Sequence, residues 1–236
     1  NVLTIGGKKY AVTNPYYALR NLMPKSTMSR EYAGGLVGYL SYEALNYMET
    51  SLKIKTHKKF EQFMFGVYTD GLIHDKLTDE LFYFYYEKDR SSILKDVLKE
   101  KVKIGAFSAK CVGEGLTEKE HARIVEDVKE KIREGKTFQC EVGFKTEYKI
   151  EGDTVKIYER LREINPSPFM YYLKFGNPSS APSSAKATGR AKQGYGGQGK
   201  KIIGASPELL FSLRDGEMTT RPLAGTITRG TNPKED

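Results

Sequence analysis

An alternation of helical and extended segments in the second half of the chain does most to limit the fold. Residues 118–134 place apolar side chains at helical spacing. Thr117 and Glu120 form a capping box, in which each side chain satisfies a backbone donor of the first turn. Gly135 follows as a stop signal. We expect the buried stripe of this helix to consist of Ile124, Val125, Val128 and Ile132.

Extended segments and a second helix continue this order. A strand is predicted over residues 138–150 and another over residues 169–175. Between them a helix begins after Asp153, and its expected inward residues are Ile157, Leu161 and Ile164. The Asn-Pro-Ser-Pro sequence at 165–168 ends this helix, because proline lacks a backbone donor and restricts its predecessor. Helices and strands in this succession predict a mixed α+β domain.

A hairpin signal lies near the end of the chain. Asp215-Gly216 separates two β-compatible runs, 209–213 and 217–223. Asp-Gly in this position is typical of a tight two-residue turn. An earlier apolar run at 202–205 ends in a Ser-Pro step and predicts a further strand.

The return strand of this hairpin runs into Ala224, Gly225 and Thr226. Gly225 permits a backbone angle that other residues resist, or a close approach by a ligand. Thr226 adds a hydroxyl and a backbone N–H, which would suit a carboxylate. Taken locally, the same residues fit a plain strand end better than a binding site, since a short motif is only a hypothesis.

The first third of the chain predicts short strands. Residues 2–12 suggest two strands around a Gly-Gly pair, and residues 34–48 suggest a glycine-rich strand followed by a helical segment. Residues 60–87 are interpreted as a meander of strands. Its aromatic residues fit a sheet core and rim better than a platform for stacking bases: Phe82, Tyr83, Phe84, Tyr85 and Tyr86.

Composition indicates a globular protein of one or two domains. Hydrophobic residues make up 39% of its 236 residues, and no apolar run is long enough to span a membrane. Residues 1–25 carry no signal-peptide pattern, so we expect a cytoplasmic protein without membrane contact. Cys111 and Cys140 lack metal-ligand spacing and fit cytosolic thiols, and no metal site is assigned.

The net charge of +8 is unevenly distributed. Residues 178–200 form a low-complexity segment without acidic residues, and its basic residues are Lys186, Arg190, Lys192 and Lys200. Because half of the excess charge lies there, a nucleic-acid surface over the folded part is not favoured. We expect a mobile hairpin insertion in this segment, with an RNA-binding tail as the alternative.

Five motifs taken in order resemble component I of anthranilate synthase, within the chorismate-utilising enzymes: GGLVGYLSYE, REGKTFQCEVGF, LREINPSPFMYYLKFG, IIGASPELLF and PLAGTITRG. The resemblance implies an α+β sandwich of packed antiparallel sheets flanked by helices, of which this chain holds part. It divides the chain into an N-terminal regulatory or scaffold portion, 1–115, and the first part of a chorismate-binding domain, 116–236.

The resemblance also implies a reaction. Ammonia from a glutamine amidotransferase subunit would add to chorismate with the help of Mg²⁺, and pyruvate would leave to give anthranilate, an intermediate of tryptophan biosynthesis. Gly225 and Thr226 match the substrate-contacting Gly-Thr of the family. Ala224 stands where aminodeoxychorismate synthases usually carry a nucleophilic lysine, which favours anthranilate synthase over that relative.

The sequence NPSPFM resembles the tryptophan feedback site of anthranilate synthases, and Pro168 and Met170 would line that site. This match disfavours the isochorismate and salicylate synthases, which also tend to have a small residue at the position of Ala224. The alternative interpretation is a proline-terminated helix that enters a core strand.

The sequence departs from the family in its extent. The Mg²⁺-binding glutamates and the remaining catalytic residues are expected beyond Asp236, so catalytic residues stay unknown and the chain alone is expected to be inactive. A complementary C-terminal half is therefore an expected partner, beside chorismate, the amidotransferase subunit and tryptophan. A non-catalytic binding module and an RNA-associated protein remain alternatives.

Overall fold

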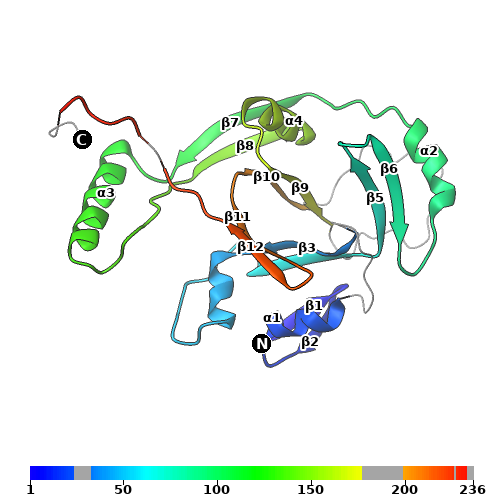
Figure 1. The fold of residues 1–236 in the computed structure, drawn as a ribbon, viewed down its shortest axis with the longest axis horizontal. Helices are drawn as coiled ribbons and strands as arrows, with labels where there is room; N and C mark the ends of the chain where they lie inside the picture. Colours follow the sequence, from blue (N-terminus) through cyan, green and yellow to red (C-terminus); the bar gives the residue numbers. More distant parts are fainter. Residues whose placement is uncertain (24–32, 177–198, 226, 233–236) are drawn as a thin grey trace. The chain divides into compact units, whose positions relative to one another are not determined.

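The computed structural model describes residues 1–23, 33–176, 199–225 and 227–232. Figure 1 shows the helices and strands along the chain. The chain divides into two compact units. The first unit holds residues 1–101 and 173–202, and the second holds residues 102–172 and 203–236. All sheets in the described ranges consist of two strands, and short helices accompany them. The predicted α+β class is therefore confirmed.

The first unit begins with a tight hairpin. Strands β1 (Val2–Ile5) and β2 (Lys8–Ala11) pair antiparallel around Gly6 and Gly7, as predicted. Both glycines have positive φ angles, 54° and 82°, which the twist of a two-residue hairpin requires. Helix α1 (Pro15–Ala18) follows, and η1 (Leu19–Leu22) continues it.

Strands β3 (Gly35–Leu40) and β4 (Phe63–Tyr68) form the second antiparallel pair. Gly38 lies opposite Phe65, and a Cβ atom on Gly38 would lie 2.0 Å from the carbonyl oxygen of Met64. The backbones of β3 and β4 are thus closely packed at Gly38. The 3₁₀ helix η2 (Tyr42–Tyr47) follows β3, as the helical pattern predicted.

Strands β5 (Asp70–Asp75) and β6 (Glu80–Tyr85) form a separate hairpin. The predicted continuous meander over residues 60–87 is wrong, because β4 pairs with β3 and not with β5. Only Thr69 lies between β4 and β5, and one residue is too short for a turn between paired strands. The aromatic residues of β6 do divide between core and rim: Phe84 is buried and Tyr85 is exposed.

The core of the first unit is small. Its buried apolar residues include Leu3, Leu19, Ala33, Ala44 and Phe84. The unit also contains η3 (Ser91–Ile93) and α2 (Leu94–Lys99), whose residues are not buried.

The second unit contains strands β7 (Phe107–Glu114) and β8 (Thr146–Gly152), which pair antiparallel with an irregularity near Cys111. Between them lies α3 (Glu118–Arg133), with the predicted capping box and with Gly135 at a φ of 72° after its end. The strand predicted over 138–150 begins only at Thr146. That prediction is wrong for residues 138–145, which pair with no described strand.

Helix α4 (Val155–Ile164) lies between β8 and β9 (Phe169–Phe175), as predicted. The apolar stripes of α3 and α4 are covered less than expected. Ile132 in α3 and Ile164 in α4 are 38% and 62% exposed, and no residue of either helix is buried. The stripe predictions are therefore wrong at Ile132 and Ile164, whose side chains are exposed in the last turns of α3 and α4.

The C-terminal part of the chain follows the predicted order. Strand β10 (Lys200–Ser206) pairs with β9, and β11 (Leu209–Arg214) pairs with β12 (Glu217–Arg221). Asp215 and Gly216 have φ angles of 48° and 83°, which confirms the tight turn. The return strand ends at Arg221 rather than at Leu223. The predicted insertion falls mostly on residues 177–198, which lie outside the described residues.

Candidate functional site

The Pro-Leu-Ala-Gly step directly follows β12 and is tied to the start of β11. The side-chain Oε1 atom of Glu208 accepts a hydrogen bond from the backbone N–H of Leu223 at 3.3 Å. The Ser206 hydroxyl donates to the carbonyl of Glu208 at 3.3 Å, and the Thr220 hydroxyl donates to the carbonyl of Leu210 at 2.8 Å. The Ser-Pro-Glu turn and the Pro-Leu-Ala-Gly step are thus joined across the open end of one hairpin.

Of the three residues predicted to bind substrate, the structure describes Ala224 and Gly225, and Thr226 lies outside the described residues. Ala224 and Gly225 are exposed. The backbone of Gly225 is not left-handed, and a Cβ atom placed on it would have no neighbour within 4 Å. The glycine is therefore not required by the conformation of this chain.

Pro168 and Met170, the predicted effector residues, lie where α4 passes into β9. Asn165 is the C-cap of α4, Pro168 is exposed and Met170 is half-buried as the second residue of β9. This is the geometry of a proline-terminated helix entering a strand. Among the described residues, no hydrogen bond, ion pair or ring contact joins Pro168 or Met170 to Ala224 or Gly225.

The junction of α4 and β9 is held by tyrosines. The hydroxyls of Thr154 and Tyr172 lie 2.8 Å apart, and the ring of Tyr158 packs edge-on against Tyr172 at 6.2 Å. On the neighbouring strand, a Cβ atom on Gly204 would lie 2.3 Å from the ring of Tyr171. The contacts of Tyr172 join β9, which carries Met170, to α4 and the residue before it. The position of Gly204 shows that β10 packs closely against Tyr171 of β9.

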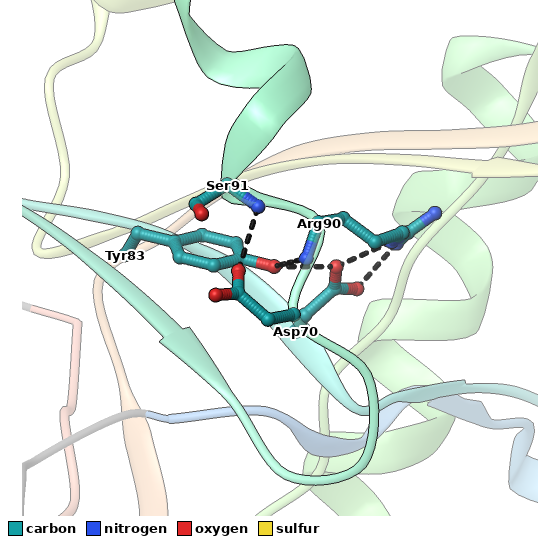
Figure 2. Close-up of polar contacts among 5 residues, drawn as sticks. Asp70, Tyr83, Arg90 and Ser91 are labelled. Carbon is teal, nitrogen blue, oxygen red and sulfur yellow. Dashed lines mark hydrogen bonds and ion pairs between the residues drawn. The ribbon is translucent and has the colours of Figure 1, made fainter.

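A polar cluster in the first unit was not found from the sequence. Figure 2 shows Arg90 beside Asp70, with the Arg90 Nε atom donating to Asp70 Oδ2 at 2.6 Å and a second guanidinium nitrogen donating to the other carboxylate oxygen. The Tyr83 hydroxyl donates to Asp70 Oδ2 at 3.2 Å and accepts from the Arg90 backbone N–H at 2.9 Å. Hydrogen bonds from Arg90 lower the pKa of Asp70 below its ordinary value of 3.8.

This cluster connects residues that are 20 positions apart, and no spacing rule predicts such a pair. Its donors and acceptors satisfy one another, and it fastens the segment before α2 to the β5–β6 hairpin. We therefore assign it a structural role.

The described residues include two open recesses that were compared with the predicted sites by their lining. One, of about 320 Å³, is lined by Tyr16, Tyr17, Leu19, Arg20, Met23 and Leu36 in the first unit. The other, of about 450 Å³, lies in the second unit and is lined by Gly115, Leu116, Gly143, Phe144 and Lys145. Neither contains residues of the two predicted sites.

Comparison with known proteins decides the family. The chorismate binding enzyme family matches residues 7–236. The chain belongs to the chorismate binding enzyme family. Anthranilate synthase component 1 of Leptospira biflexa is 42% identical over 239 residues, covering 100% of this chain and 47% of that protein. Anthranilate synthase component 1 of Methanothermobacter thermautotrophicus is 32% identical over 229 residues, covering 97% of this chain and 44% of that protein.

A solved structure shows the same fold. Anthranilate synthase component I from Streptococcus pneumoniae superimposes with a TM-score of 0.64 at 22% sequence identity, covering 93% of this chain and 50% of that one. The family resemblance and the fold expected from it are thus confirmed. The chain spans about half the length of the curated relatives it matches.

Two further observations on this member of the chorismate binding enzyme family concern metal ligands and membrane-spanning helices. Among the described residues, no group of three or more His, Cys, Asp or Glu side chains could hold a metal ion. No helix in the described ranges is long and apolar enough to cross a membrane.

Proposed function

We propose that this chain is the portion of an anthranilate synthase component I that forms one wall of its chorismate site. The whole enzyme would convert chorismate and ammonia to anthranilate and pyruvate. The observation that carries this proposal is the family match over residues 7–236, together with 42% identity to a relative named anthranilate synthase component 1.

The segment at Ala224 supports the choice of activity. An alanine at this position has no nucleophilic atom, so it cannot form the covalent adduct that a lysine would form with the ring. This favours direct addition of ammonia over the aminodeoxychorismate route. The small side chain also leaves room beside the ring for the incoming nucleophile.

Gly225 and Thr226 would bind a carboxylate of chorismate. Gly225 is exposed and has open space on its Cβ side, so a ligand could approach its backbone closely. Glu208 would hold the wall in place, because its carboxylate anchors the N–H of Leu223 two residues before Gly225. Glu208 is thus a positioning residue in this proposal.

The remaining parts of the enzyme follow from the family and stay proposals. Mg²⁺ would assist loss of the ring hydroxyl, with ligands from outside the described residues. A glutamine amidotransferase subunit would supply ammonia in the cytoplasm. Tryptophan would bind near Pro168 and Met170 as a feedback inhibitor.

The test is a product assay. The chain is mixed with chorismate, ammonium and Mg²⁺, alone and together with the remaining portion of the Leptospira biflexa relative, and anthranilate fluorescence is recorded. We expect no product from the chain alone and anthranilate from the completed protein. Aminodeoxychorismate, isochorismate or salicylate as the product would refute the proposed activity.

Two variants sharpen this assay. Glu208→Ala removes the acceptor for Leu223 and should raise the KM for chorismate with little change in fold stability, since the bond is exposed. Glu208→Gln keeps an acceptor oxygen at this position and should remain close to the parent protein. Equal KM values for all three proteins would contradict a positioning role for Glu208.

A further inference from the structure

The excess positive charge of the chain is concentrated in two segments. Residues 50–60 contain four lysines and no acidic residue, and residues 178–200 contain four basic residues and no acidic residue. These eight residues equal the whole formal net charge of +8, so the rest of the chain carries as many acidic as basic residues. We call residues 50–60 the lysine loop, and its lysines are Lys53, Lys55, Lys58 and Lys59.

The lysine loop connects η2 to β4 and is held in place by two side chains. Asn46 donates from Nδ2 to the carbonyl of Ile54 at 2.8 Å, and its Oδ1 atom accepts the N–H of Ile54 at 2.9 Å. The Nδ1 atom of His57 accepts from the backbone N–H groups of Lys59 and Phe60 at 3.1 and 3.2 Å. Because the backbone is already fixed at these points, a ligand that binds the loop costs little ordering entropy.

The four lysines are exposed and have no acidic partner. Within the described residues none of them forms an ion pair, whereas lysines of α3, β8 and α4 each pair with a glutamate: Lys129, Lys149 and Lys156. The acidic residues that flank the loop are engaged elsewhere. Glu49 accepts the N–H of Ser51 at 2.9 Å, and Glu61 pairs with Lys200. The loop thus presents four positive charges that no described carboxylate contacts.

Aromatic rings and a fifth cation lie beside these lysines. Lys200, the last residue of the second basic segment, places its Nζ atom 5.5 Å from the centre of the Phe60 ring. Phe60 is 41% exposed, and its ring centre lies 5.5 Å from that of the exposed His57. Residues 177–198 lie outside the described residues and form no part of this surface.

We propose that the lysine loop, together with Lys200, is a binding surface for single-stranded nucleic acid. The ammonium groups would contact phosphates, and a base would stack on the ring of Phe60 or His57. Unpaired bases offer their faces to such rings, whereas the bases of a duplex stack on one another. The rings therefore favour a single strand over a duplex, and over an acidic protein surface that would use the lysines alone.

The placement of the charge carries this proposal. Composition alone does not favour a nucleic-acid surface on the folded part, because an average over the chain does not show where the charge lies. The structure places four uncompensated lysines on one fixed loop and brings the end of the second basic segment to it. The surface shares no residue with the Pro-Leu-Ala-Gly step, so the proposal does not depend on the proposed function.

Fluorescence anisotropy with a labelled single-stranded RNA of about 16 nucleotides provides the test. It is run on the chain and on a covalent chimera with the remaining portion of the Leptospira biflexa relative, which shows whether the surface stays accessible in a completed protein. We expect a Kd of about 1–100 μM near 0.1 M salt. With four phosphate contacts, the logarithm of the binding constant should fall against the logarithm of the salt concentration with a slope of about −3.

Two double variants provide the matched comparison, because both lower the net charge by the same amount. Lys58→Gln with Lys59→Gln removes two charges from the lysine loop, and Lys129→Gln with Lys156→Gln removes two charges from ion pairs of α3 and α4. We expect the loop variant to weaken binding by about tenfold or more and to reduce the slope to about −1.4. The control variant should change the affinity by less than about twofold.

Phe60→Leu tests the contribution of the ring. Leucine keeps an apolar side chain at this half-open position but offers no face for a base. We expect this variant to bind the RNA about fivefold or more weakly and to bind inorganic polyphosphate as the parent chain does.

Five outcomes would overturn the proposal. Two concern the protein: no RNA binding by the chain, or binding by the chain that is lost in the chimera. Equal weakening by the two double variants would assign the binding to net charge rather than to the loop. An unchanged affinity of Phe60→Leu for RNA would assign the surface to polyanions in general, and tighter binding to phosphatidylserine vesicles than to RNA would assign it to a membrane.

Discussion

Replacing Gly38 by alanine should destabilise the first unit through a backbone clash. Gly38 lies in β3 opposite Phe65, and a Cβ atom on it would lie 2.0 Å from the Met64 carbonyl oxygen and 2.7 Å from the Phe65 Cα atom. Contacts of a Cβ atom below 3.0 Å are essentially never seen, so β3 and β4 must separate by about 1 Å. Both atoms belong to the backbone and cannot rotate away.

The magnitude follows from the ladder between the two strands. A separation of about 1 Å stretches the nearest N–H···O distances beyond hydrogen-bond range. Loss of two such bonds costs about 1–3 kcal/mol, and alanine returns about 0.4–1 kcal/mol by restricting the unfolded chain. We expect Gly38→Ala to lower the free energy of unfolding by about 1–2 kcal/mol.

Gly225→Ala is the matched control, because it makes the same chemical change where nothing opposes it. No atom lies within 4 Å of the new Cβ position, and the backbone there is not left-handed. Only the effect on the unfolded chain remains, so stability should rise by up to about 1 kcal/mol or stay unchanged. Gly38→Ala should therefore lower the free energy of unfolding, whereas Gly225→Ala should not.

Urea unfolding provides the measurement. The chain has 16 tyrosines and no tryptophan, so tyrosine fluorescence and circular dichroism are the suitable signals. With slopes of about 1–3 kcal/mol/M, the Gly38→Ala midpoint should fall by about 0.3–2 M while the slope stays constant. Equal midpoints for Gly38→Ala and the parent chain would refute the inferred contact between β3 and β4.

The remaining predictions concern a helix cap, an ion pair and the substrate wall. Thr117→Ala should cost about 1 kcal/mol of stability by removing the cap of α3, and Thr117→Ser should restore most of it in the same urea assay. Because Arg90 lowers the pKa of Asp70, the stabilisation by this pair should be complete above about pH 4 and be lost as the pH falls through the lowered pKa. Asp70→Asn should reduce the fall in the free energy of unfolding between about pH 4 and lower pH. The same fall in the variant and the parent chain would contradict this prediction. In the completed enzyme, Gly225→Ala should raise the KM for chorismate at unchanged fold stability, and an unchanged KM would remove Gly225 from the substrate wall.

Features encoded within a few residues could be predicted from the sequence. The cap at Thr117, the stop at Gly135 and the turn at Asp215-Gly216 are each determined by local backbone geometry, and the structure confirms all three. The Ala224 and Gly225 step was placed correctly after a hairpin, although its return strand ends earlier than expected. Its role in binding depends on a ligand, and so stays a prediction.

Features that depend on distant partners could not be predicted. Asp70 and Arg90 are 20 positions apart, and no local sequence pattern around either residue indicates that their side chains meet. The separation of β4 from β5 follows from a one-residue connection, which hydrophobic pattern alone does not reveal. Pattern identifies a strand, but its neighbour is chosen by the length of the connection and by the rest of the core.

The errors in the second unit have one physical origin. Ile132, Ile164 and Phe138 were all expected to be covered or paired, and all three are exposed in the structure. An amphipathic pattern reports the burial that a segment has in its complete surroundings, while the described residues supply only the surroundings within this chain. Exposing a large apolar side chain forfeits about 1.5–3 kcal/mol of stabilisation. Each of these three residues gives up part of that stabilisation in the described structure, so a pattern of apolar residues by itself does not establish burial.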